Sequence, residues 1–511
     1  MFLIFSILTL SIVFTKPLLE DWGIISWFRN APPDFAMWTT WIKNTFNGTP
    51  ARPFQIIAWV TGIQVGKLLP FTFEHNSILG IALVHGIMGI LKLFIILKCI
   101  PTEYKNTTKY LICLIAIYPA VWPSIFNPQS LSSQFASVLY LLMIFLLFRY
   151  DKTLKIKYLF GLSLILLMML MTYQGLILSF AFTLLFLYLL NRKLKNEQSI
   201  KFFKIWSTVI VSGLLYVAYL YLQFKRLGNL GYETSGAGTS SMREIGISLV
   251  KTLMNIFPTL LRESPFLNLI WFLSIYYLIK HFCANNPFLK ISTLFFCLSP
   301  VTGVIFFFNL EWSNDPNRVL FTTSFSISSL LLVLLHQNGQ SVEVKLKTKT
   351  KKSNVKSSFN PKDITKIQLI FLLVQILIGI YLHGNLILRS YSDQKELIKV
   401  VKSEIDFSEK NPILIRDYSQ EVGDYYFFFG AGAVLNSALS AEGITSDITF
   451  CSPTTSSEGF KVVHRQAIIR KIGNGPQTHP GSCFENRFLN GSFYKTYDLS
   501  RVNGNFVLRE P

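Results

Sequence analysis

The sequence is dominated by long apolar runs, and few folds are open to such a chain because backbone placed in lipid has to be helical or in a closed barrel. Each run holds roughly 17–25 residues, enough for a helix to cross the hydrocarbon core of a bilayer. Only 15% of the residues are charged, against roughly 25% in soluble domains. Eleven runs lie at 1–19, 77–97, 110–125, 131–148, 157–172, 173–190, 205–224, 266–282, 289–308, 316–336 and 367–388. The sequence predicts a polytopic α-helical membrane protein with about eleven transmembrane helices.

Basic residues are concentrated between these runs. The net charge of +20 arises within residues 1–388, because residues 389–511 carry 14 basic and 14 acidic side chains. Five loops, at 98–109, 149–157, 191–204, 280–290 and 337–366, together hold 22 Lys and Arg, whereas the loops at 119–130 and 173–175 hold none. Since basic loops tend to stay in the cytoplasm, we expect a cytoplasmic N-terminus and an external C-terminal region. This placement accounts for the charge without a nucleic-acid partner.

The membrane domain is expected to span 1–388 and to carry two large external loops, at 20–76 and 225–265. The first run has no basic segment before it and no small-residue cleavage site, so we expect it to remain as a transmembrane helix. Residues 55–70 are apolar but belong to none of the eleven runs. We expect an amphipathic helix on the outer surface, and a twelfth span is the alternative. The apolar face of that helix would hold Ile56, Ile57, Val60 and Ile63.

Residues 389–511 are expected to form a small external α/β domain. The spacing of apolar residues predicts a helix over 395–405 and short strands at 413–415 and 447–450. Cys451 and Cys483 are the two cysteines of this region. An oxidising compartment favours a disulfide between them, with two free buried thiols as the alternative. Their surroundings show no metal-binding spacing.

Acidic residues are absent from the predicted spans and gather in the external loops. His85 and Lys92 lie within the span at 77–97, and we expect the Lys92 side chain to reach the inner membrane surface. An ion-coupled transporter would instead carry paired acids near the midplane. Glu20 and Asp21 directly follow the first span and precede Trp22, which we expect to anchor the chain in the membrane interface. A carboxylate there is ionised at neutral pH and suits a general base that takes a proton from a hydroxyl. A solvated acid that caps the span is the plainer alternative.

Two arginines beside the predicted membrane boundary suit a phosphate. Arg52 lies between prolines in Pro50-Ala51-Arg52-Pro53, and Arg318, which we prefer for the phosphate, lies at the start of the span at 316–336. A guanidinium binds phosphate through two parallel hydrogen bonds. An ordinary interfacial cation, or an ion pair with Asp315, would explain the same residues. Further polar residues suited to sugar or acceptor hydroxyls lie in the external loops: Asp34, Asn127, Gln129, Tyr173, Gln174, Glu311 and Asp315.

Together these features resemble the GT-C superfamily of integral-membrane glycosyltransferases. The closer similarity is to the serotype-converting O-antigen glucosyltransferases of bacteria and their phages. Those proteins have a similar length, a critical acidic residue just after the first span, matched here by Glu20-Asp21, and a periplasmic C-terminal domain with cysteines. The Arg-Pro of Ala51-Arg52-Pro53-Phe54 is similar to a Gly-Arg-Pro-Leu motif of related enzymes, with Ala in place of Gly. Because Glu-Asp replaces the commoner Asp-Asp or Asp-Glu pair, either acid is a candidate base.

The resemblance implies an inverting transfer of glucose from undecaprenyl-phosphate glucose to a hydroxyl of the O-antigen repeat of lipopolysaccharide. It places the chain in the bacterial inner membrane, with the C-terminal domain in the periplasm. It implies functional partnership with a glycolipid flippase and a glucosyl-lipid synthase, and neither a metal nor another cofactor. An O-antigen polymerase or a mannosyl- or arabinosyltransferase is the second interpretation, and a polysaccharide flippase or transporter is the third.

Overall fold

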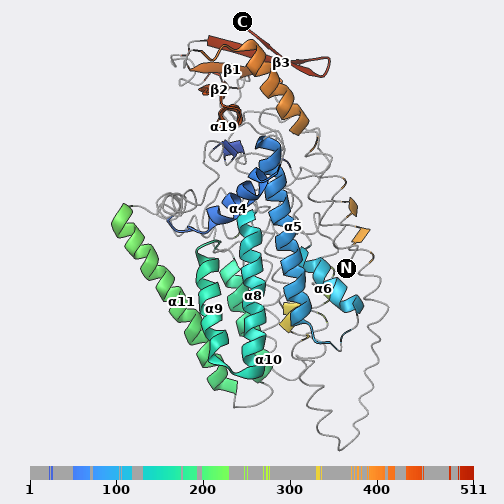
Figure 1. Ribbon diagram of the computed structural model, residues 1–511, viewed down its shortest axis with the longest axis vertical. Helices are drawn as coiled ribbons and strands as arrows, with labels where there is room; N and C mark the ends of the chain where they lie inside the picture. The colour runs from blue at the N-terminus through green and yellow to red at the C-terminus, as the bar shows by residue number, and fades with distance from the viewer. Residues whose placement is uncertain are drawn as a thin grey trace, which may run out of the picture.

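A computed structural model gives the fold of the chain (Figure 1). The residues that it describes are 16, 22–23, 25–26, 50–69, 73–102, 104, 106–117, 131–173, 176–192, 198–228, 247, 250, 269, 272–273, 276, 330–333, 335, 370, 373–374, 377–378, 381, 388, 391–408, 412–419, 433–451, 453, 483–484, 493 and 495–511.

Long helices form the larger part of the described structure, and a small sheet lies at one end of it (Figure 1). The helices are α4 (Gln55–Lys67), α5 (Phe73–Cys99), α6 (Asn106–Ile117), α8 (Leu131–Thr153), α9 (Ile156–Leu170), α10 (Ile177–Arg192) and α11 (Gln198–Leu227). Successive helices from α8 to α11 run in alternating directions, with α8 beginning and α9 ending at the end nearer the sheet, which we call the sheet end. Their shared core contains Tyr140, Phe180 and Leu184, all fully buried.

Among the described residues, three helices are long and apolar enough to cross a membrane, namely Leu79–Cys99, Gln134–Thr153 and Lys201–Leu227. They coincide with the runs predicted at 77–97, 131–148 and 205–224. The runs at 157–172 and 173–190 correspond to the shorter apolar helices α9 and α10, and α6 covers the first half of the run at 110–125. The other predicted spans lie wholly or largely outside the described residues, so the count of eleven stays a prediction.

Helix α4 packs tightly against α5 through glycine. A Cβ atom on Gly80 of α5 would lie 2.1 Å from the carbonyl oxygen of Gly62 and 2.3 Å from the nitrogen of Gly66. Gly62 and Gly66 form a small-xxx-small pattern, which lets two helix backbones approach closely. From the sequence we expected the apolar face of this segment to lie on the membrane surface, but its Val60 and Ile63 are buried within the protein. With 13 residues, α4 is also too short for a span, which needs about 20.

The sheet has four strands in the order β2-β1-β3-β4. They are β1 (Ile413–Asp417), β2 (Ile448–Cys451), β3 (Lys495–Val502) and β4 (Asn505–Arg509). Strand β1 is parallel to both β2 and β3, and β3 turns back into β4 as an antiparallel hairpin. The short strands expected from the sequence therefore exist, and they begin within one residue of the predicted positions.

Helices cover one face of the sheet and a disulfide-linked segment contacts the other. The helical residues 391–404 and α19 (Ala433–Ala441) pack Leu397, Val401 and Leu439 against alternate strand residues such as Ile415. On the opposite face, Leu414 contacts Cys451, which forms a disulfide with Cys483, the pairing expected from the sequence.

Two residues from the start of the chain complete this core. Trp22 is fully buried and Ile25 is 1% exposed, and both belong to the same hydrophobic cluster as the sheet and its helices. The short helical segment that carries them lies next to α19 (Figure 1). The C-terminal α/β unit, which we call the C-terminal domain, is thus completed by residues that precede it by more than 360 positions.

Candidate functional site

The segment Pro50–Phe54, just before α4, is held in place by backbone hydrogen bonds at the sheet end of the helices. The hydroxyls of Tyr216 and Tyr219 on α11 donate to the carbonyls of Ala51 and Pro50, each at 2.8 Å. The backbone N–H of Phe54 donates to the carbonyl of Met171, directly after α9, at 3.0 Å. The chain around Arg52 is therefore tied both to α11 and to the end of α9.

The Arg52 side chain lies over an aromatic ring. Its guanidinium carbon is 5.8 Å from the ring centroid of Tyr173, a distance at which a cation is attracted by the ring face. Tyr216 and Tyr219 lie with their rings 6.4 Å apart and inclined by 25°. Arg52 and Tyr173 were both predicted site residues, and the structure brings them together. We call Arg52, Tyr173, Tyr216 and Tyr219 the Arg52 cluster.

The Arg52 cluster combines groups that recognise a phosphorylated sugar. A guanidinium can bind phosphate through two hydrogen bonds, and the partly exposed rings of Tyr173 and Tyr219 offer flat apolar surface with a polar edge. Gln223 lies one turn beyond Tyr219 on α11, and its buried Oε1 has no hydrogen-bond partner among the residues that the structure describes. A ligand hydroxyl could donate to that oxygen. The two α11 tyrosines and Gln223 were not predicted from the sequence, although their spacing of three and four residues places them on one helix face.

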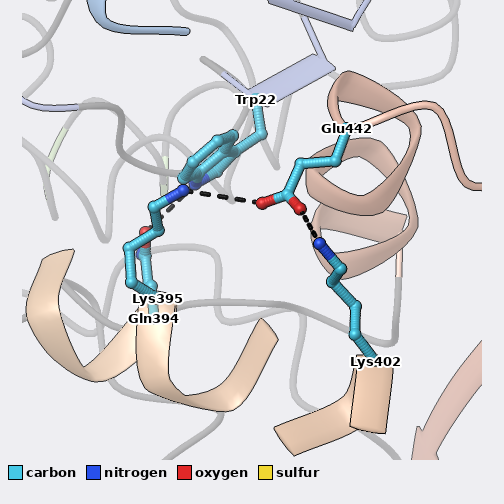
Figure 2. Close-up of polar contacts among 5 residues, drawn as sticks. All are labelled: Trp22, Gln394, Lys395, Lys402 and Glu442. Carbon is cyan, nitrogen blue, oxygen red and sulfur yellow. Dashed lines mark hydrogen bonds and ion pairs between the residues drawn. The ribbon is translucent and has the colours of Figure 1, made fainter. Parts of the chain in front are cut away.

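Trp22 does not anchor the first loop in the membrane interface, as its position after the first span had suggested. Its indole N–H donates to Oε1 of Gln394 at 3.0 Å (Figure 2). Its ring is nearly parallel to that of Tyr391, with centroids 6.3 Å apart. The indole is apolar except for one N–H, so the protein core is as favourable as an interface once Gln394 satisfies that donor.

Charged groups surround the Trp22 contact. The Lys395 ammonium lies 5.7 Å from the centroid of the Trp22 ring and 3.5 Å from Oε1 of Glu442. Lys402 bonds the other oxygen of that carboxylate (Figure 2). Burial alone would raise the pKa of Glu442, but hydrogen bonds and charge from Lys402 and Lys395 outweigh it and hold the pKa below its usual value. The ionised carboxylate therefore links the helical residues 391–404 to the end of α19.

Lys92 takes a different position from the one expected. The sequence suggested that its side chain reaches the inner membrane surface, but the residue is 5% exposed and its ammonium donates to Gln134 near the start of α8. Lys92 therefore faces the interior of the helix bundle, where the Gln134 amide oxygen accepts a hydrogen bond from its ammonium group.

The remaining predicted site residues lie outside the described residues. They are Glu20, Asp21, Asp34, Asn127, Gln129, Gln174, Glu311, Asp315 and Arg318. Within the described part of the chain, no group of three or more His, Cys, Asp and Glu side chains could hold a metal ion.

Comparison with known proteins assigns no family to this chain. No protein-family model matches the sequence. No curated protein matches it either. The function therefore has to be argued from the arrangement of its own residues.

Proposed function

We propose that this chain is a membrane glycosyltransferase that moves a sugar, glucose in the first instance, from a polyprenyl-phosphate donor to a hydroxyl of the O-antigen repeat. The observation that carries the proposal is the Arg52 cluster, a guanidinium over a tyrosine ring at one end of a bundle of apolar helices. A polyprenyl donor needs such a place, since its tail belongs among apolar side chains and its phosphate at the boundary.

The direction of the helices supports an external reaction. The last turn of α8, the turn that follows it and the start of α9 carry Arg149, Lys152, Lys155 and Lys157, and this turn lies at the end of the bundle away from the sheet (Figure 1). Basic turns favour the cytoplasmic side, so the Arg52 cluster and the C-terminal domain would share the periplasmic side of the bacterial inner membrane.

The proposed reaction is a single displacement with inversion at the sugar C1 atom. A carboxylate of the Glu20-Asp21 pair takes the proton of the acceptor hydroxyl while the hydroxyl oxygen forms a bond to C1. The bond between C1 and the phosphate oxygen breaks, and its electron pair leaves with polyprenyl phosphate. Arg52, with Arg318 as a second cation, would stabilise the charge that develops on that phosphate.

The first test is mass spectrometry of lipopolysaccharide from cells with and without the gene. The proposal requires one added hexose on each repeat. A change in chain length would instead indicate a polymerase, and loss of all O-antigen would indicate a flippase.

The second test separates Arg52 from arginines that only support the fold. Arg52→Lys replaces a bidentate fork with a point charge and should raise the KM for the lipid donor roughly tenfold or more, about the loss of one charge-assisted hydrogen bond. Arg149→Lys is the matched control, because Arg149 also lies over an aromatic ring, 5.0 Å from the Phe145 centroid, but at the other end of the bundle. Equal donor KM values for the two variants would remove Arg52 from the site.

A further inference from the structure

Residues on both sides of the acidic pair contact the same aromatic ring. The Lys16 ammonium lies 5.5 Å from the centroid of the Tyr391 ring, and Trp22 stacks on that ring at 6.3 Å. The chain that leads from Lys16 to Trp22 carries Glu20 and Asp21. That chain therefore starts and ends at one side chain of the C-terminal domain.

Several independent contacts hold Trp22 and the residues after it against the C-terminal domain. Besides the Tyr391 stacking, Trp22 donates to Gln394, which is itself fully buried. One helical turn further on, Ile25 enters the core of the C-terminal domain, and the Ser26 hydroxyl bonds the Ser440 hydroxyl of α19 at 2.7 Å. The spacing of three and four residues places Trp22, Ile25 and Ser26 on one helix face. We call Lys16, Trp22, Tyr391, Gln394 and Lys395 the Tyr391 clasp.

A general base must be held within a few tenths of an ångström of its working position, and a shift of about 1 Å far from the chemistry can lower a rate about 10²-fold. The Glu20-Asp21 pair needs such precision to act as a base, and it directly precedes Trp22 in the sequence. The clasp supplies that precision from the other end of the chain, through a rigid ring embedded in a packed core.

We propose that the Tyr391 clasp positions the Glu20-Asp21 pair for proton removal, so that the C-terminal domain is a working part of the transferase. This inference rests on the proposed function. The clasp residues are positioning residues, since they would act through the acidic pair rather than touch the substrate.

The contact between the N-terminal segment and the C-terminal domain can be tested without an activity assay. In the full-length protein, Ser26→Cys together with Ser440→Cys should form a disulfide under mild oxidation, because the two hydroxyl oxygens are 2.7 Å apart. Proteolysis between the two positions, followed by non-reducing electrophoresis, would show the N-terminal and C-terminal fragments still joined. Each single variant is the control for the native cysteines. Absence of the cross-link overturns the clasp.

The positioning role is tested with two variants of one residue. Tyr391→Phe keeps the ring and should retain transfer, whereas Tyr391→Leu removes both ring contacts and should lower kcat roughly 10²-fold with an unchanged KM for the lipid donor. The Ser26–Ser440 cross-link, added to Tyr391→Leu, should restore transfer, because it replaces the lost contacts by a covalent one. A structural defect in the C-terminal domain would not be repaired in this way.

The outcomes separate the two proposals. If Tyr391→Leu is as active as Tyr391→Phe, or if its defect lies in donor KM, the positioning role is wrong. If the cross-linked protein is inactive without other changes, the docked arrangement is not the working one and the inference fails. If the doubly substituted protein forms the cross-link but the wild-type protein transfers no hexose, the proposed function is refuted and the inference with it. The contact between the N-terminal segment and the C-terminal domain would still stand.

Discussion

Replacement of Gly80 by alanine should push α4 away from α5. The added Cβ would meet three backbone atoms of α4 at 2.1–2.5 Å, whereas a close carbon–oxygen contact needs about 3.3 Å. Because the atoms in the way belong to the backbone, no side-chain rotation relieves the clash. Helix α4 must therefore move by about 1 Å.

The expected loss of stability follows from two opposing effects. Overpacking costs about 1–3 kcal/mol, and three simultaneous backbone clashes place Gly80→Ala near the upper value. Alanine returns about 1 kcal/mol of helix propensity, which leaves a net loss of about 2 kcal/mol. The same substitution at Gly213 of α11, where nothing lies within 4 Å of the new Cβ, should stabilise by about 1 kcal/mol.

Thermal inactivation of the two variants in detergent would measure this difference. Gly80→Ala should lose its fold at a lower temperature than wild type, and Gly213→Ala at the same or a higher temperature. Because Arg52 precedes α4 by three residues, Gly80→Ala should also raise the KM for the lipid donor. Equal midpoints for the two variants would refute the argument from close helix packing.

Three further predictions concern the first loop and the C-terminal domain. Asp21→Asn should retain the fold and lose transfer by roughly 10²–10⁴-fold, with Glu20→Gln as the comparison; full activity of the double variant in a hexose-transfer assay would leave neither acid a role. Replacing Cys451 and Cys483 by serine removes a cross-link between positions 32 residues apart, which stabilises the fold by about 3–4 kcal/mol in the chain-entropy model. The yield of folded protein should therefore fall. Non-reducing mass mapping that finds both thiols free in the wild-type protein would contradict this prediction. Glu442 has a lowered pKa in the fold, so its contribution to folding stability is present above its ordinary pKa of about 4.3 and disappears as pH falls through the folded pKa. Glu442→Gln should therefore reduce the loss of thermal stability at acid pH. An unchanged loss in thermal melts would exclude the Lys395–Glu442–Lys402 link.

Most of the described helices between α5 and α11 could be predicted from apolar length, because backbone placed in lipid has little choice but to be helical. Apolar length alone located α5, α8 and α11, and it also located α9 and α10, since every N–H and C=O in hydrocarbon has to be satisfied within its own segment. Short apolar segments likewise located β1 and β2 in the C-terminal domain. These are local properties, and a local pattern is sufficient to encode them.

The contacts of the candidate site depend on helix packing rather than on local sequence. Arg52 and Tyr173 were each proposed from their neighbours in the sequence, but nothing in those neighbours predicts that one lies over the other. The hydroxyls of Tyr216 and Tyr219 meet their carbonyls across more than 160 residues. Such pairs depend on how helices pack, which the composition of either partner does not specify.

The sequence by itself determined the apolar helices, the α/β character of the C-terminal domain and the acidic and basic residues available for chemistry, because each depends on a residue and its near neighbours. Only the tertiary structure decided the partner of Trp22. From the sequence, an indole after a span is as well suited to the membrane interface as to a protein core. The choice is made by a buried amide, Gln394, and a facing ring, Tyr391, which become neighbours of Trp22 only after the C-terminal domain has folded around it.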